Sequence, residues 1–449
     1  MLCPFWKPHL IVPAPRGGVK GNRIEPMIAR IVEKLAGLYI GWRMIAVGCA
    51  IRVLGGGLHA YGLSVFFLPV TLELGLTRTA TSLVFSLARA QGAIEGPLAG
   101  YCIDHYGPRP VIAIAIALAG IGYLLLANVH SYAALMMVYM GVISLSYQAG
   151  FMDATMAVAN SWFIRKRALA MSITSGSIAL GGAMLTPFLA YAVHRWGWRA
   201  ASVGAGAAFL LAGLPLSLLI QRSPESLGLL PDGESHQPQR GEAKGVNDAG
   251  TSVIEREFSL REALRTYQFW LLACATSFRV ICSSGVLVHF VPIMVWKGYS
   301  EPQGAFYLGV IAFCGMPTHL LIGWLGDRIN KPRLMAAFMM LGSLSIYFLF
   351  HGNSAWQLWI AVLLFSVFEG LFPVTWATVG DFFGRNNFAK IRGSMSFLYT
   401  WGSVLGPVIA GAIYDRTNSY AALFWALFGL CWLTALLYFL MFQPKAKPS

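Results

Sequence analysis

Six ionisable side chains occur inside stretches that are otherwise almost entirely apolar: Arg52, Arg89, Glu95, Asp153, Arg279 and Glu369. A charge at the centre of a lipid bilayer costs about 2.5–3.5 kcal/mol on insertion scales, so each group needs a partner or a function. The arginines balance the carboxylates in number. Because an arginine fork matches the two oxygens of a carboxylate, the set could bind a small organic anion or pair internally.

The sequence leaves both interpretations open. Counted along helices at about 1.5 Å per residue, Arg52, Glu95 and Asp153 fall at similar depths, so Arg52 could pair with either acid. Arg279 and Glu369 both fall near the middle of the membrane and could also pair. Arg89 and Arg279 lie near the middle of the membrane, where a small anion would sit, and they are close to side chains that can form hydrogen bonds. The predicted substrate-binding residues are Arg89, Arg279, Tyr61, Tyr147 and Gln148.

The three acids suggest how transport could be coupled to protons. If every arginine is paired with an acid, none is available to an anionic substrate. A buried carboxyl can take up a proton near neutral pH, and protonation of Asp153 or Glu369 would release its arginine. A carrier would then load a proton and an anion together. The predicted proton-coupling residues are Asp153, Glu369 and Glu95.

Long apolar helices must position these groups. Hydrophobic residues make up 57% of the 449 residues, charged residues 12%, and the mean hydropathy is +0.62. A soluble protein of this length carries about twice that charged fraction. Repeated runs reach the roughly 20 apolar residues needed to cross a bilayer. We expect an all-α membrane protein with twelve transmembrane helices at 43–71, 79–103, 110–129, 132–162, 168–193, 199–220, 268–296, 304–326, 334–351, 355–380, 392–414 and 419–442.

The distribution of basic residues predicts the orientation. The net charge is +14, and most Lys and Arg fall in loops on the side of the N-terminus. Positive charge collects on the cytoplasmic side of a membrane, so both termini should be cytoplasmic. This bias explains the charge without a nucleic-acid partner. The cysteines lack metal-ligand spacing and no nucleophile or cofactor pattern stands out, so we expect no metal, no cofactor and no enzymatic activity. The lack of a P-loop implies that ATP does not drive the protein.

The chain should divide into five parts. Residues 1–42 form a cytoplasmic tail with an amphipathic helix, 43–220 a six-helix bundle, and 221–267 a polar cytoplasmic linker. Residues 268–443 form a second six-helix bundle and 444–449 a short tail. The two bundles also resemble each other in sequence, which indicates the internal duplication found in many secondary transporters.

The clearest repeat is GYCIDHYGPRP at 100–110 and GWLGDRINKPR at 323–333. A carboxylate here can accept hydrogen bonds from the N-terminal amides of a neighbouring helix, and an arginine can pair with that carboxylate. The pattern Gly-x-x-x-Asp-x-x-Gly-x-Arg resembles the signature loop of the major facilitator superfamily. That resemblance implies the major facilitator fold, with loops that latch the two bundles on the cytoplasmic side when the carrier faces outward. The latch residues would be Gly100, Asp104, Gly107, Arg109, Gly323, Asp327, Arg328 and Arg333.

A narrower resemblance concerns YGLSVFFLPVTLELGLTRTATSL, NSWFIRKRALAMSI, LVHFVPIMVWKGYS and RSPESLGLLPDG. These segments resemble the bacterial monocarboxylate-transporter and oxalate/formate-antiporter families. The resemblance implies a secondary active transporter that moves a small organic anion, foremost a monocarboxylate, by alternating access with a proton or a counter-anion. Carriers of those families often place an arginine in helix eight, where this chain has Thr318 and His319. The relatives' substrates therefore do not carry over.

Other functions remain as alternatives. An efflux carrier for amphipathic drugs or metabolites would rely on aromatic cavity residues more than on arginines. An anion exchanger would need no proton. A non-transporting membrane sensor would place its functional part in the polar segment 221–266, whose composition shows no packed-domain pattern.

Overall fold

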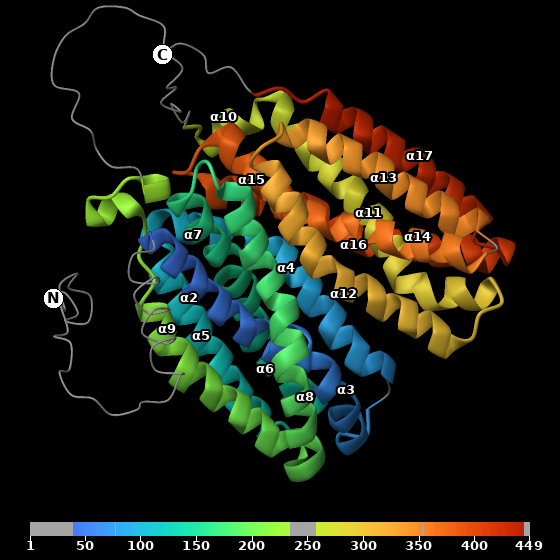
Figure 1. Cartoon of the computed structure of the whole chain (residues 1–449). Coiled ribbons are helices and arrows are strands. Elements are labelled where there is room, and N and C mark those ends of the chain that lie inside the picture. The colour runs from blue at the N-terminus through green and yellow to red at the C-terminus, as the bar shows by residue number, and fades with distance from the viewer. Residues whose placement is uncertain (1–38, 77, 234–256, 353, 444–449) are drawn as a thin grey trace, which may run out of the picture. The chain divides into compact units, whose positions relative to one another are not determined.

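The computed structural model describes residues 39–76, 78–233, 257–352 and 354–443. Every contact discussed below lies within the compact unit Ile40–Ser449. Most of the amphipathic helix expected before residue 43 lies outside the described residues. Within them, the regular elements are all helical, and the helices of the first and second halves gather in two groups, coloured blue to green and yellow to red (Figure 1).

The first half is a series of helical segments. In chain order they are α2 (Ile40–Leu54), η2 (Gly55–Ala60), α3 (Gly62–Glu73), α4 (Arg78–Tyr106), α5 (Pro108–Leu126), α6 (Tyr132–Val138), η3 (Tyr139–Ser144), η4 (Tyr147–Ala154), α7 (Thr155–Trp162), α8 (Arg167–Ala208), η5 (Phe209–Gly213) and α9 (Leu214–Leu218).

The linker and the second half follow. Short elements of the linker are η6 (Pro224–Leu227), η7 (Pro231–Gly233) and α10 (Leu260–Leu264). The second half contains α11 (Tyr267–Trp296), α12 (Glu301–Gly326), α13 (Lys331–His351), α14 (Ala355–Phe365), α15 (Val367–Phe383), α16 (Phe388–Thr417) and α17 (Ala421–Phe439).

Ten helical stretches of the described residues are long and apolar enough to cross a membrane. One of them, Arg167–Leu218, has 52 residues, or about 78 Å of helix against a hydrocarbon core of about 30 Å. Gly197 interrupts it with φ 79°, so this stretch has the length and the break for two crossings. The 29-residue helix α4 is not among the ten, and it carries Arg89 and Glu95. The twelve crossings expected from sequence stay a prediction.

Local sequence explains where several helices begin. Gly107 has φ 91°, which suits glycine, and Pro108 follows as the first residue of α5. At the start of α12, the Ser300 hydroxyl accepts from the amide of Gln303, and the side-chain oxygen of Gln303 accepts from the amide of Ser300. At the start of α13, the Asn330 side chain accepts from the amide of Arg333. The ends of the helices near the two motif loops, 100–110 and 323–333, are called the motif end below.

The two halves approach each other closely at the motif end. Helix α4 packs along α16, and α8 packs against α12 and α15. Gly96 and Gly393 face each other's backbone, and Gly100 lies against the backbone of Ala389. A side chain at any of these glycines would collide with main-chain atoms of the other half, so the contact between α4 and α16 requires glycine there.

The fourth helical stretch is irregular where it carries polar residues. Segments η3 and η4 are π-helical, and η4 holds Tyr147, Gln148 and Asp153. Such wider turns are rare, and they occur often at functional sites. Here η4 turns Asp153 into the protein interior, where its side chain is 2% exposed.

Candidate functional site

Two aspartates of the repeated motif cap helices of the opposite half. The carboxylate of Asp104, in α4, accepts from the amides of Ala389 at 3.2 Å and Lys390 at 2.8 Å, at the start of α16. The carboxylate of Asp327, after α12, accepts from the amides of Ala168 at 2.8 Å and Leu169 at 3.0 Å, at the start of α8. Each satisfies amides that lack partners within their own helix and meets the positive end of the helix dipole.

Both aspartates lie beyond the expected spans 79–103 and 304–326. Burial raises the pKa of Asp104 to about 6, against hydrogen bonds from Lys390 and Ala389 that lower it. Burial likewise raises the pKa of Asp327 to about 6, against bonds from Leu169 and Ala168. Because desolvation outweighs the hydrogen bonds, both carboxyls titrate nearer to neutral pH than an exposed aspartate does.

The remaining motif residues differ in exposure. Gly100 and Gly323 are buried at helix contacts, Gly323 against Ser172 of α8. Gly107 forms the turn before α5. Arg328 is exposed and stacks on the ring of Trp324 at 3.7 Å.

Arg109 and Arg333 are also exposed. The expectation that the motif arginine pairs with the motif aspartate is therefore wrong for Arg109, because the partners of the Asp104 carboxylate are backbone amides. The cation that contacts Asp104 is Arg222, which donates to its backbone carbonyl at 3.1 Å.

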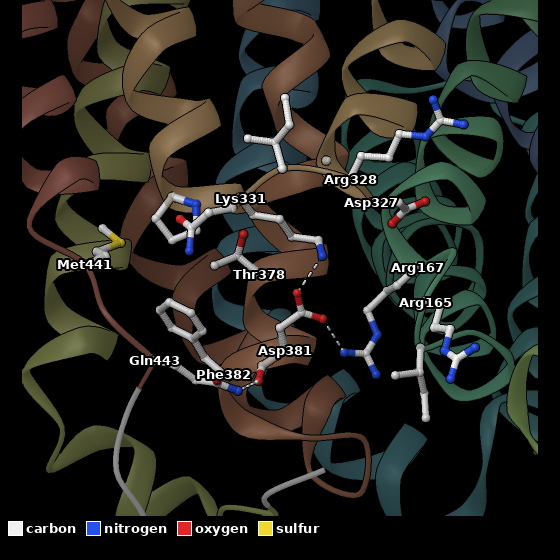
Figure 2. Close-up of a pocket in the computed structure, with 15 residues that line it drawn as sticks. Arg165, Arg167, Asp327, Arg328, Lys331, Thr378, Asp381, Phe382, Met441 and Gln443 are labelled. Carbon is white, nitrogen blue, oxygen red and sulfur yellow. Dashed lines mark hydrogen bonds and ion pairs between the residues drawn. The ribbon is translucent and has the colours of Figure 1, made fainter. Parts of the chain in front are cut away.

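A second link between the halves lies beside the Asp327 cap. Asp381, at the end of α15, pairs with Arg167 of α8 at 2.7 Å and with Lys331 of α13 at 2.6 Å. These residues line a hollow of about 360 Å³ at the motif end. Figure 2 shows Arg167 and Lys331 converging on Asp381, whereas Arg328 extends away from it.

In the membrane interior, Arg52 does not form the ion pair considered from sequence. Its guanidinium, 1% exposed, donates to the carbonyl oxygens of Phe151 at 2.9 Å, Met152 at 2.8 Å and Thr174 at 3.1 Å, and to the hydroxyl of Thr155 at 2.7 Å. Phe151 and Met152 lie in the π-helical segment η4, and Thr174 lies in α8. Arg52 therefore ties the first half together.

Asp153 instead pairs with Arg392 of α16, in the second half. Gln148 supports the same carboxylate oxygen, with its amide nitrogen 3.0 Å from Oδ1. Arg392 is 1% exposed and lies over the ring of Trp376 at 4.6 Å. Sequence reasoning missed Arg392 because it placed the start of this helix at residue 392, whereas α16 begins at Phe388. The four-residue difference moves Arg392 a full turn inside the helix.

Arg279 makes no ion pair with Glu369, contrary to the pairing considered from sequence. Arg279 is 2% exposed, and its Nη1 donates to the carbonyl oxygen of Phe368 at 2.8 Å. No described residue accepts from its Nε or Nη2. A buried arginine with two donor nitrogens that have no acceptor is costly in an apolar interior, and this arrangement suits an anionic ligand.

Two titratable groups, His319 and Glu369, interact electrostatically with each other near Arg279. Glu369 of α15 is half-buried, and it interacts electrostatically with Tyr61 of the first half and with His319 of α12. His319 also interacts electrostatically with Arg279. Its Nδ1 lies 2.7 Å from the carbonyl oxygen of Gly315. Because a carbonyl only accepts, Nδ1 carries a hydrogen, and in the neutral ring Nε2 keeps its lone pair.

The other predicted residues lie in the first half. Glu95 accepts from the side chain of Gln91, and its Oε2 has no partner among the residues that the structure describes. Tyr147 packs on the ring of His59 at 4.6 Å. Tyr61 is 46% exposed. The side chain of Arg89 lies outside the described part of the chain.

Known proteins share both the sequence pattern and this fold. The model of the family described as Major Facilitator Superfamily matches residues 45–389 and 312–449. Human monocarboxylate transporter 2 is 25% identical over 402 residues, covering 85% of this chain and 81% of the relative. A probable hexose phosphate transport protein of Chlamydia pneumoniae is 25% identical over 358 residues, covering 77% of this chain and 78% of the relative.

Solved structures agree at the level of fold. A human organic anion transporter superposes with a TM-score of 0.65 at 16% identity, covering 88% of this chain and 98% of its own. The Escherichia coli fucose:proton symporter gives a TM-score of 0.61 at 14% identity, with the same coverage. The relatives are transporters rather than enzymes, as expected. The chain is a multi-pass membrane transporter that belongs to the major facilitator superfamily.

Proposed function

We propose that the protein carries a small organic anion, foremost a monocarboxylate, across the membrane together with a proton. The observation that carries this proposal is Arg279, an arginine buried in a membrane-spanning helix, whose Nε and Nη2 donate to no described residue. A carboxylate would accept both in a bidentate pair. The names of the monocarboxylate-transporter relatives agree with this substrate class.

Glu369 and His319 supply groups that can exchange a proton beside Arg279. Proton uptake at Glu369 would remove a negative charge next to the incoming anion, so the two would bind together and cross as a near-neutral load. Tyr61, from the first half, interacts with Glu369 across the site. A substrate there would touch both halves, as alternating access requires.

The motif end would face the cytoplasm and serve as the latch of an outward-facing state. The two aspartate caps and the Arg167–Asp381 pair join the halves at that end. Opening the motif end would break these contacts and expose the site to the other side. In this proposal twelve helices cross a bacterial inner membrane, and both termini are cytoplasmic, in accord with the basic loops.

The direct test is uptake of labelled lactate, pyruvate, acetate, oxalate and formate into proteoliposomes. Each acid is measured with an inward proton gradient and with that gradient collapsed. Gradient-driven accumulation of one acid supports proton symport, whereas uptake that needs a second anion inside supports exchange. If folded protein takes up none of these acids, the monocarboxylate proposal is wrong and efflux of larger amphipathic compounds becomes the leading function.

A further inference from the structure

The linker places one carboxylate against each half at the motif end, and the first of these is Asp232. This residue lies in η7, at the end of the part of the linker that follows the first half. Its carboxylate accepts from three consecutive main-chain amides in the loop before α8, those of Ile164 at 2.9 Å, Arg165 at 2.8 Å and Lys166 at 3.3 Å. Successive amides that converge on one anion form a concave binding surface. Asp232 therefore holds this loop in one shape.

Glu257 makes the matching contact in the second half. It lies in the part of the linker that leads into α10 and α11, and its two oxygens accept from the amides of Arg385 at 3.0 Å and Asn386 at 2.9 Å. These amides belong to the loop before α16. The next linker residue, Phe258, adds a bond from its carbonyl oxygen, which accepts from the side chain of Asn387 at 3.0 Å. Each end of the linker is thus bound to a loop of the half that it adjoins.

The two contacts occupy equivalent positions in the two halves. In each half, the linker carboxylate binds amides that lie four residues before the amides capped from the opposite half: 164–165 before 168–169, and 385–386 before 389–390. Helices α8 and α16 therefore both begin between two carboxylates, one from the linker and one from the opposite half. The two linker segments differ in sequence, so the shared geometry indicates a shared role.

The two loops also carry or adjoin arginines that reach the opposite half. Arg167, directly after the first loop, pairs with Asp381 of α15 at 2.7 Å. Arg385, in the second loop, donates through Nη1 to the carbonyl oxygen of Ser161 in α7 at 3.0 Å and to Glu225 of the linker at 2.8 Å. The shape of each loop therefore sets the position of a helix start and of an arginine that contact the other half.

We propose that Asp232 and Glu257 are positioning residues through which the linker controls how tightly the motif end closes. The hydrogen bonds of each carboxylate go to a loop of the half that its end of the linker adjoins, so each acts on the opposite half through that loop. A change in the linker that withdraws either carboxylate favours the open motif end. The inference rests on the proposed role of the motif end as a latch, and it does not depend on which substrate is carried.

Distances between the halves, measured on the full-length protein without substrate, test this role. Spin labels replace two exposed residues outside both loops, Tyr106 at the end of α4 and Tyr267 at the start of α11. Asp232→Ala and Glu257→Ala should each raise the ratio of open to closed motif end about threefold, less than the loss of a direct cap, because each acts through its loop. The double variant should raise the ratio about ninefold, because effects at separate loops add.

A double-mutant cycle separates positioning from general loosening. On an Asp327→Ala background, Asp232→Ala should add clearly less than threefold, because the cap at the start of α8 is already lost, whereas Glu257→Ala should keep its full effect on α16. Asp232→Asn and Glu257→Gln each keep one acceptor, so they should fold even if an alanine variant does not, and they should give smaller shifts in the same direction. Asp415→Ala removes an exposed carboxylate at the far end of α16 and should leave the ratio unchanged.

Hydrogen exchange of the amides at 164–166 and 385–386 shows whether each loop has been released. Faster exchange with an unchanged distance distribution means that the carboxylates hold their loops without controlling the latch, and it overturns the inference. Equal effects of Asp232→Ala with and without Asp327 would also overturn it. Wild type that takes up none of the labelled acids overturns the proposed function but not this inference, because the distance measurement needs no substrate.

Discussion

At the scale of single residues, the buried arginines differ in how completely their donors are used. Arg52 is satisfied by backbone carbonyls and a hydroxyl, so it stabilises the first half. Arg279 has two buried donor nitrogens without an acceptor among the described residues, Nε and Nη2, and Arg392 has one, Nε. Because an unsatisfied buried donor costs about 1–3 kcal/mol, Arg279 and Arg392 are the arginines at which a ligand gains most.

The first prediction concerns Arg279. Arg279→Gln should reduce substrate affinity about tenfold or more, because a bidentate charged pair is lost. Arg279→Lys should restore only part of it, because an ammonium cannot form the fork. Affinity is measured as the concentration dependence of uptake, with Arg416→Gln as the control for loss of a positive charge. Wild-type affinity in Arg279→Gln would exclude this residue from the site.

The second prediction concerns Glu369. Glu369→Gln fixes a neutral side chain beside Arg279, so the variant should still exchange substrate across the membrane but should no longer accumulate it against a gradient. Counterflow and gradient-driven uptake, measured on the same vesicles, report these two activities separately. Asp415→Asn is the matched control, since it removes an exposed carboxylate. Coupling equal to that of wild type would remove Glu369 from the scheme.

Residue identities could be predicted from sequence better than their pairings. The apolar context alone predicted that Arg279 and Asp153 lie in the interior, and the structure buries both. It could not predict that Arg52 binds carbonyls, because these belong to η4 and α8 and reach Arg52 only through the packing of the helices. It also missed Arg392, because it began the helix at residue 392, although Asn387, a residue type favoured at helix N-termini, directly precedes the true start at Phe388.

At the scale of elements, the repeated motif works by helix capping across the two halves. Asp104 caps α16 and Asp327 caps α8, so each half supplies the carboxylate that the other half's helix needs. The glycines beside them allow the backbones to meet. The sequence predicted that a carboxylate here would satisfy a neighbouring helix. It could not say which helix, because that depends on how the two halves pack.

A third prediction follows for these caps. Asp327→Ala removes an acceptor from two amides at the start of α8, and loss of such a cap costs about 1 kcal/mol. We expect the population with an open motif end to rise about fivefold. Spin labels at the exposed residues Tyr106 and Asn386 would report the distance between the halves. Asp327→Asn keeps one acceptor and should shift the population less; an unchanged distance distribution in Asp327→Ala would contradict the latch.

At the scale of the whole molecule, the contacts described here join the halves at the motif end and through Asp153–Arg392. A transporter that alternates between two states must break these contacts when its halves separate at the motif end. The energetic question is therefore which ligands favour the separated arrangement. Protons also bind at the motif end, where the raised pKa values of Asp104 and Asp327 mean that they favour the joined arrangement.

A fourth prediction concerns pH at the motif end. Asp104 and Asp327 have pKa values of about 6 in this arrangement, raised by burial from 3.8. When the motif end opens and the carboxyls become hydrated, their pKa values should fall back toward 3.8, so the closed arrangement binds protons more tightly. Lowering the pH from 7 to 5 should therefore favour closure. The same spin-label pair measures this, and Asp104→Asn/Asp327→Asn should lose the pH dependence. Opening at low pH would contradict the assignment.

The most direct test of the central claim is uptake of the five labelled acids by wild-type protein in proteoliposomes, with and without an inward proton gradient. We predict that one or more monocarboxylates accumulate above the external concentration only while the gradient is present, and that Arg279→Gln abolishes this accumulation. Folded protein that takes up no acid under either condition would contradict the claim that this membrane protein carries organic anions with protons.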